Sequence, residues 1–210
     1  MKKDLNSVKM AAGEGARAYH HGALREALID AAESILEERG VEGFSLREAA
    51  RRAGVSPAAP GHHFGDARGL LTAVATRAFR DFGDALEAGD VGTSRMERLR
   101  GIGMAYVGFA LANRARFELM WRKSMLDRED AAFCEAGDRA FDILDRIARG
   151  EGAGEGPDLT AMAPSIAGWS IVHGFVELAL SGAFGTGPEE LKAATEQLLP
   201  RVLDHLVIAD

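Results

Sequence analysis

The segment from Ser45 to Phe64 contains the start and stop signals of two short helices in quick succession. Ser45 and Glu48 have capping-box spacing, in which each side chain satisfies a backbone N–H that the first helical turn leaves unpaired. Gly54 can adopt the left-handed conformation that ends a helix and turns the chain. Ser56 suits the N-cap of a second helix, and Pro57 suits its first position. These signals predict two helices joined by a tight turn, which is a helix-turn-helix.

Composition restricts the class of protein. A chain of 210 residues with 47% hydrophobic and 27% charged residues is ordinary for a soluble globular protein. The single cysteine, Cys134, excludes an internal disulfide framework and a multi-cysteine metal site within one chain. The sequence contains neither an apolar run long enough to span a bilayer nor the charge pattern of a signal peptide. We therefore expect a cytoplasmic protein.

The net charge of −7 is distributed unevenly. Residues 1–80 hold 12 Lys/Arg and 10 Asp/Glu, a net charge of +2, which leaves 13 and 22, a net charge of −9, for residues 81–210. Four of the six histidines also lie in the first part. This asymmetry suits a small nucleic-acid-binding domain attached to an acidic body.

Helical periodicity predicts an all-α fold, because no stretch shows sustained strand-like alternation. We expect a mobile tail over 1–18, an amino-terminal three-helix domain with the helix-turn-helix over 19–65, and a larger helical domain over 66–210. The tail is either solvated disorder or an arm for the minor groove. Pro200 should kink or interrupt the last helix. Outside the helix-turn-helix, the helices are expected at about 22–39, 66–86, 94–112, 114–125, 129–149, 160–184 and 188–207, with a flexible connection over 149–158.

The segments Tyr19–Arg25 and Ser45–Phe64, with Leu70 and Leu71 after them, resemble the amino-terminal domain of TetR/AcrR-family transcriptional regulators. In the second half, Trp169 followed by His173 and Gly174 resembles the Trp-His-Gly signature of one subgroup's carboxy-terminal domain. The resemblance implies a homodimer that places two helix-turn-helix units in adjacent major-groove half-sites of an operator. It also implies a small-molecule pocket in the body and a dimer interface built by the last two helices.

The resemblance assigns the DNA-binding positions. The recognition helix would carry small residues for close approach and histidines for polar contacts, while other side chains bind phosphates. Alternatively, the adjacent histidines only form a solvated helix surface. The recognition positions are Ala58, Ala59, Gly61, His62 and His63, and the phosphate-binding candidates are His21, Ser45 and Arg47.

Two positions depart from the family pattern. Gly61 stands where tyrosine is usual, and Ala67 stands where lysine is frequent. Both usual residues can bind phosphate, and Arg68 is close enough to replace one of them. We also expect Pro60 to weaken the recognition helix, because it would lie too deep in that helix to avoid the loss of a hydrogen bond.

The expected effector is hydrophobic or aromatic, because the body contains an apolar and sulfur-rich set of side chains with one titratable member. The competing interpretation is that these side chains are simply core. Trp169 and His173 share one helix face, so they either line a cavity together or brace the dimer helices. The candidates are Met104, Phe117, Met120, Trp121, Phe141, Trp169 and His173.

Apolar residues surround much of the expected helices 160–184 and 188–207, including Ile166, Val172, Leu198, Leu199, Leu203 and Leu206. They form either a dimer interface or an intramolecular core. The helix over 66–86 joins the two expected domains and is the natural lever for a ligand-driven change.

The sequence does not contain a phosphate-binding glycine-rich loop, a nucleophile elbow or a helical zinc motif, so we expect neither an enzyme nor a bound metal or cofactor. A pairing of Cys134 with His173 as nucleophile and base would require an accident of tertiary structure. The remaining alternative is an all-α ligand- or partner-binding protein with weakened DNA recognition.

Overall fold

The computed structural model describes residues 6–150 and 160–205, with side chains from Gly22 onward. Helices account for the regular structure of these residues, apart from an isolated bridge between Ala183 and Gly185. The all-α expectation is therefore confirmed.

The chain divides into two compact units. The first unit comprises Met1–Val74 and Arg122–Asp127, and the second comprises Ala75–Trp121 and Arg128–Asp210. Helix α4 (Ala67–Gly89) continues from the first unit into the second. The expected boundary at 65/66 lies just before this helix, whereas the first unit extends into it and also includes a segment far away in sequence.

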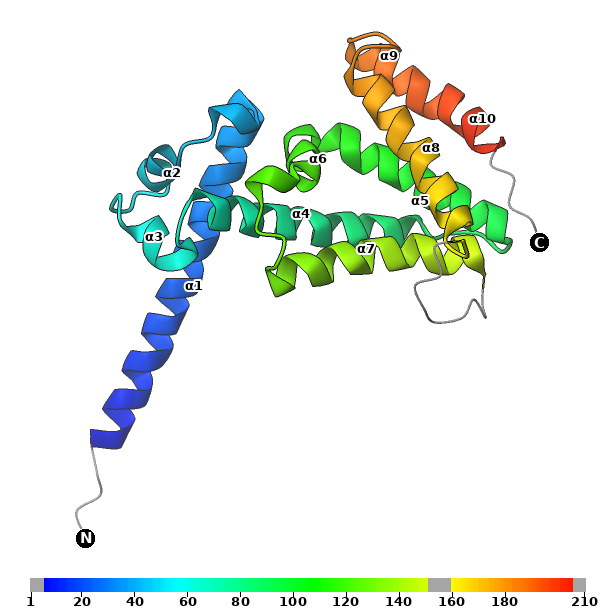
Figure 1. Ribbon diagram of the computed structural model, residues 1–210. Coiled ribbons are helices and arrows are strands. Elements are labelled where there is room, and N and C mark those ends of the chain that lie inside the picture. Colours follow the sequence, from blue (N-terminus) through cyan, green and yellow to red (C-terminus); the bar gives the residue numbers. More distant parts are fainter. Residues whose placement is uncertain (1–5, 151–159, 206–210) are drawn as a thin grey trace. The chain divides into compact units, whose positions relative to one another are not determined.

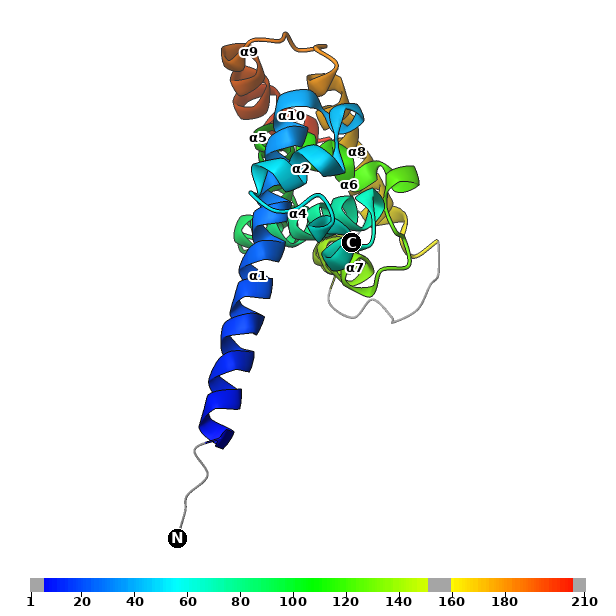
Figure 2. The same cartoon turned by 90° about the vertical axis from the view of Figure 1, so that its left-hand side faces the viewer.

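The first unit is built on α1 (Asn6–Arg39), which begins before the expected start near Gly22. Gly40 follows with a φ of 69°, so the chain turns there as expected. A 3-10 turn (Val41–Gly43), α2 (Leu46–Arg52) and α3 (Ala59–Phe64) come next. The carboxy-terminal half of α1 carries α2 (Figures 1 and 2), and Arg52 fixes this packing with hydrogen bonds of 2.7 and 2.6 Å to the Glu38 carboxylate.

The turn after α2 has the expected geometry. The Ser45 hydroxyl accepts from the Glu48 N–H at 3.4 Å, although the Glu48 carboxylate binds Arg51 and Arg52 rather than completing a capping box. Gly54 has a φ of 69°. The N–H groups of Gly54 and Val55 donate to carbonyls of α2 at 3.2 and 3.0 Å, the two bonds of a Schellman motif. The prediction of a glycine hinge is therefore confirmed.

The predicted start of the recognition helix is wrong. Ser56 and Pro57 lie in a turn, closed by a 3.0 Å bond from the Ala59 N–H to the Ser56 carbonyl, and α3 begins at Ala59. Pro60 therefore occupies the first turn of α3, where a backbone N–H would have no helical partner. The expected penalty at Pro60 does not arise, and the buried proline ring instead anchors the helix.

The second unit contains the rest of α4 and the following helices, close to their expected positions. The Asp66 carboxylate accepts from the Gly69 N–H at 3.0 Å, so Asp66 caps the start of α4 as expected. These helices are α5 (Arg95–Ala112), α6 (Arg114–Trp121), α7 (Ala131–Arg149), α8 (Ala163–Leu180), α9 (Pro188–Ala193) and α10 (Leu199–Leu203). A π-helical segment, Ala194–Leu198, separates α9 from α10 just before Pro200, which confirms the expected interruption.

Helices α5, α7 and α8 pack against one another, and α10 packs on α5. Arg139 of α7 binds Asp84 and Glu87 of α4 at 2.7 and 2.8 Å. The Ser165 hydroxyl of α8 donates to Asp145 of α7 at 2.6 Å. Among the described helices, α8 alone is long and apolar enough to cross a membrane, and 33% of that stretch is buried.

Two glycines of the first unit provide a matched test of the hinge. Alanine at either position would meet open space, but only Gly54 has a positive φ. Gly54→Ala should lower the free energy of unfolding by about 1–2 kcal/mol, because a side chain is strained in the left-handed region. Gly61→Ala should raise it by up to about 1 kcal/mol through helix propensity. Urea unfolding measures both, and equal effects would contradict the assigned turn.

Candidate DNA-binding surface and ligand cavity

The helix-turn-helix exposes most of the residues that the sequence assigns to DNA. Arg47 of α2 and Ala58, Gly61 and His62 at α3 are exposed, whereas Ser45, Ala59 and His63 are partly buried. The side chain of His21 lies outside the described residues. The surface is therefore small and open at α3, as close approach to a major groove requires.

The three arginines of α2 differ in their freedom to bind a phosphate. Arg51 and Arg52 hydrogen-bond Glu48 and lower the pKa of its carboxyl to about 2. Arg52 is further held by Glu38. Arg47 makes no ion pair within the described part of the chain, so its positive charge is not neutralised. It lies beside Ser45 and Pro57 in a shallow surface depression.

Arg68, which is predicted to bind phosphate, makes a structural contact within the first unit. Its Nη2 donates to the Ser124 carbonyl at 3.2 Å, while the side chain remains exposed. The Thr72 hydroxyl donates to the Arg68 carbonyl at 2.8 Å and accepts from the Asp127 N–H at 2.8 Å. The segment Arg122–Asp127 is thereby anchored to the first turns of α4 within the first unit.

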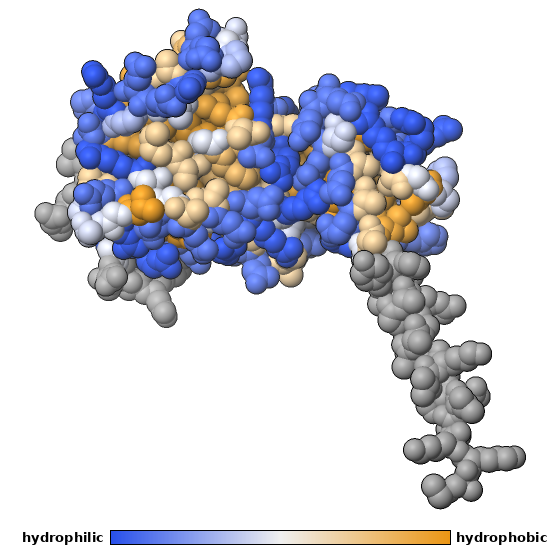
Figure 3. Space-filling view, turned by 180° about the vertical axis from the view of Figure 1, so that it is seen from behind, coloured by the Kyte–Doolittle hydropathy of each residue, from blue (hydrophilic) through white to orange (hydrophobic). Residues whose placement is uncertain are grey.

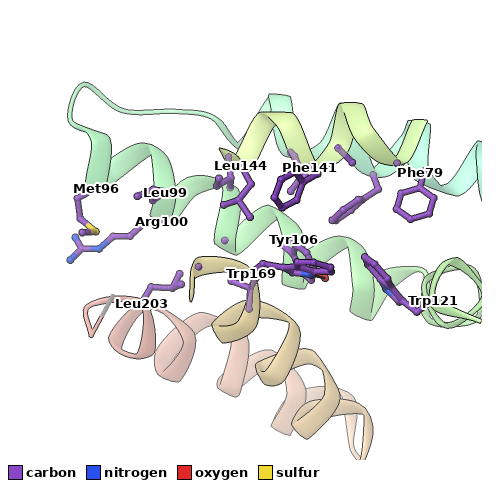
Figure 4. Close-up of a pocket in the computed structure, with 18 residues that line it drawn as sticks. Phe79, Met96, Leu99, Arg100, Tyr106, Trp121, Phe141, Leu144, Trp169 and Leu203 are labelled. Atoms are coloured by element: carbon purple, nitrogen blue, oxygen red, sulfur yellow. Dashed lines mark hydrogen bonds between the residues drawn. The ribbon is translucent and has the colours of Figure 1, made fainter. Parts of the chain in front are cut away.

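The second unit contains a cavity of about 230 Å³. Figure 4 shows Met96 and Arg100 at one end and Phe79 and Trp121 at the other. Helix α7 contributes Phe141, and α8 contributes Trp169. The wall is aromatic and aliphatic nearly throughout, so it can bind a hydrophobic molecule without a large desolvation penalty.

Three of the seven predicted effector contacts line this cavity: Trp121, Phe141 and Trp169. Phe117 and Met120 are buried in the core beside it, and Met104 packs against that core. His173 lies behind Tyr106 and does not line the cavity. The cavity wall also includes Phe79, Phe82 and Tyr106. The sequence does not single them out, because apolar helical spacing is the same for a cavity wall as for a filled core.

A short hydrogen-bond chain passes behind the cavity wall. The Trp169 Nε1–H donates to the Tyr106 hydroxyl oxygen at 3.2 Å, and that hydroxyl lies 2.8 Å from His173 Nδ1. Indole can only donate, so the Tyr106 proton is left for the imidazole, which must be unprotonated at Nδ1 to accept it. Burial raises the pKa of Tyr106. Trp169 therefore lines the cavity, whereas His173 supports the wall through its contact with Tyr106.

Burial lowers the pKa of His173 from 6.5, while the Glu177 carboxylate, 3.8 Å from Nε2, partly opposes that shift.

Within the described residues, no group of three or more His, Cys, Asp or Glu side chains could hold a metal.

The pKa shift of His173 predicts a pH dependence of stability. The unfolded chain binds a proton on this imidazole at a higher pH than the folded chain does. The free energy of unfolding should therefore fall as the pH drops below 6.5 towards the folded-state pKa. His173→Gln, which keeps an acceptor for Tyr106, should lose less stability between about pH 7 and pH 5. Urea unfolding measures this loss at each pH, and an equal loss of unfolding free energy in the two proteins would contradict the assigned protonation state.

Two family models match the chain. Bacterial regulatory proteins of the tetR family match residues 28–74, which include the helix-turn-helix. The tetracyclin repressor-like C-terminal domain matches residues 99–202, which include Trp169 and His173. Among functionally curated proteins, no sequence matched.

Solved structures resemble the chain over most of its length. A protein of unknown function from Rhodococcus sp. RHA1 is 36% identical, with a TM-score of 0.67, covering 87% of this chain and 96% of that one. The TetR family transcriptional regulator PfmR from Thermus thermophilus is 22% identical, with a TM-score of 0.61, covering 86% and 98%.

The multidrug binding protein EbrR, solved with imidazole, is 19% identical to this chain, with a TM-score of 0.55, covering 89% and 96%. Like PfmR, it shares the fold. Taken with the matched amino- and carboxy-terminal models and the helix-turn-helix geometry, these similarities show that the chain belongs to the TetR family of DNA-binding transcriptional regulators.

Proposed function

We propose that this regulator is a cytoplasmic, non-enzymatic repressor that binds a palindromic operator as a homodimer and is released by a small hydrophobic effector. The observation that carries the proposal is the presence, in one chain, of an exposed recognition helix and a nearly all-apolar cavity. Operator occupancy would block transcription sterically, and the effector would end that occupancy.

In this proposal, two copies of α3 enter adjacent major-groove half-sites about one helical turn apart. The small side chains of Ala58 and Ala59 permit close approach, and His62 and His63 supply polar contacts to bases or backbone. Ser45 and Arg47 bind phosphates. Arg68 adds a further phosphate contact through the N–H groups that Ser124 does not use.

The dimer interface is proposed on α8 and the helical segments that follow it. Ile166 and Leu178 of α8 are 41% and 51% exposed, and Leu198 is 40% exposed. Gly174 lies eight residues after Ile166 and four before Leu178 on the same helix, and it would allow a partner helix to approach closely. Seen from behind in Figure 3, the part of the molecule that holds these helices presents a broad apolar area.

Several of the apolar residues assigned to either an interface or a core are already buried in their own chain. Leu199 is fully buried, and Leu203 and Val172 are 3% and 5% exposed. They support an intramolecular core, so the proposed interface is narrower than the sequence pattern indicates. Leu206 lies outside the described residues.

In the proposed mechanism, two elements carry a signal from the cavity to the DNA-binding unit. Helix α4 contributes Phe79, Phe82 and Leu86 to the cavity wall, and its first turns belong to the first unit. Trp121 also lines the cavity, and the next residue, Arg122, begins the segment held by Arg68 and Thr72. An effector acts only if it binds one arrangement of these elements more tightly than the other.

Thr72→Val should uncouple the two sites. It removes the hydroxyl that holds Asp127 but preserves side-chain shape, so cavity affinity and ligand-free operator affinity should stay within about twofold of wild type. The ligand-induced loss of operator affinity should shrink by about fivefold or more. Thr195→Val is the control, because it removes a hydroxyl that donates to a helix carbonyl in the second unit. Unchanged release in Thr72→Val would contradict this route.

Two substitutions should separate phosphate binding from base reading. Arg47→Ala should weaken all DNA sequences alike and reduce the salt dependence by about one phosphate contact per protomer. His62→Ala should instead narrow the preference for operator over scrambled DNA, by about tenfold. Fluorescence anisotropy at two salt concentrations measures both. Identical behaviour of the two variants would refute the assigned roles.

The proposed function is tested by selecting sites from fragmented genomic DNA at near-physiological salt and then titrating the selected site against scrambled DNA. We expect a palindrome bound at least ~10³-fold more tightly than scrambled DNA. Weak binding of all DNA sequences with equal affinity would refute the proposed repressor function. It would favour a ligand- or partner-binding protein whose DNA recognition is weakened at Gly61 and Ala67.

A further inference from the structure

The cavity wall contains few polar side-chain atoms, and most of them already have partners. The Trp169 N–H is bound to Tyr106, and the Tyr106 proton is directed to His173. Arg100, at the opposite end from Trp121, forms an ion pair with Asp204. Trp169 and Tyr106 therefore offer a ligand no vacant donor, and the charge of Arg100 is balanced by Asp204.

Trp121 is different. Its Nε1–H is buried and has no hydrogen-bond partner among the described residues. Buried donors in folded proteins are rarely left unpaired, and one beside a cavity is a place where an absent ligand or water can bind. The ring planes of Phe79 and His173 are nearly perpendicular to this indole, with centroids 5.7 and 5.1 Å away. A contact from the N–H to such a ring is weaker than a hydrogen bond to a true acceptor.

The shape and size of the space restrict the ligand further. The indoles of Trp121 and Trp169 lie at an interplanar angle of 37°, with centroids 5.5 Å apart, and the Phe141 ring is 6.1 Å from Trp169. An apolar protein cavity of about 150 Å³ can hold benzene. A cavity of about 230 Å³ is half as large again, which suits two fused rings.

We propose that the effector is a neutral, planar, fused-ring aromatic molecule that presents one hydrogen-bond acceptor to the Trp121 indole N–H. This inference rests on the proposed ligand-binding function and names the chemical class. The nitrogen has almost no exposed surface without ligand, so a slight turn of the indole must bring its N–H to the acceptor. Trp121 directly precedes the segment anchored to α4, so this turn acts where the chain enters the first unit.

Competing ligand classes fit the wall less well. A second donor on the ligand would find the Tyr106 oxygen already engaged with Trp169 and His173. A carboxylate would have to compete with Asp204 for Arg100, at the far end from the free N–H (Figure 4). A purely hydrocarbon ligand would leave the Trp121 donor unpaired.

Quinoline and naphthalene test the inference, because they have nearly the same shape and only quinoline has a ring-nitrogen acceptor. Calorimetric titration of the full-length protein gives the ratio of their affinities in wild type, Trp121→Phe and Trp169→Phe. Naphthalene corrects for the change in cavity shape. We expect the ratio of quinoline affinity to naphthalene affinity to fall about tenfold in Trp121→Phe. The ratio should stay unchanged in Trp169→Phe, because the Trp169 N–H is already bound to Tyr106.

Equal ratios in wild type and Trp121→Phe would overturn the acceptor inference, while continued binding of naphthalene would leave the hydrophobic effector site intact. Failure of both compounds to bind any of the proteins would overturn the cavity as an effector site and this inference with it. If 2-naphthoate bound more tightly than quinoline, and if Arg100→Gln abolished this binding, the inference that the effector is neutral would be overturned.

Discussion

One uninterrupted helix, α4, contributes to the apolar interiors of both compact units. Leu70, Leu71 and Val74 are buried in the first unit, and Phe79 and Phe82 are buried in the second. Because side chains of close-packed interiors cannot shift freely, each unit constrains the position of its own part of the helix. A change in the packing of one part therefore acts on a helix whose other part belongs to the interior of the other unit.

The second connection is the segment Arg122–Asp127, which belongs to the first unit although its neighbours in sequence belong to the second. The side chains of Thr72 and Arg68 hold it by hydrogen bonds to its backbone. Trp121, immediately before it, lines the cavity, as do the α4 residues beyond Val74. The chain leaves the first unit after Val74 and returns to it at Arg122, and both of these elements contribute to the cavity wall. A molecule bound in the cavity would therefore have two covalent routes to the first unit.

Local signals predicted most of the fold, whereas tertiary detail escaped them. Gly54 fixed the hinge, and the caps at Ser94 and Asp130 start α5 and α7 near their expected positions. Ser56 and Pro57 misled the prediction of α3 because the same residues also favour a turn. Phe117 and Phe79 have similar patterns, yet only Phe79 lines the cavity, since helical periodicity reports burial and not which buried residues surround a space. The anchored segment depends on hydrogen bonds between distant residues.

In the proposed mechanism, the cavity and the operator-binding surface are coupled, and coupling between two binding sites must be reciprocal. The most direct measurement is the affinity of quinoline for the free protein and for the protein saturated with its selected operator. We predict that operator weakens quinoline binding by the same factor by which quinoline weakens operator binding. If quinoline bound in the cavity with equal affinity in the two states, the cavity and the operator-binding surface would not be coupled.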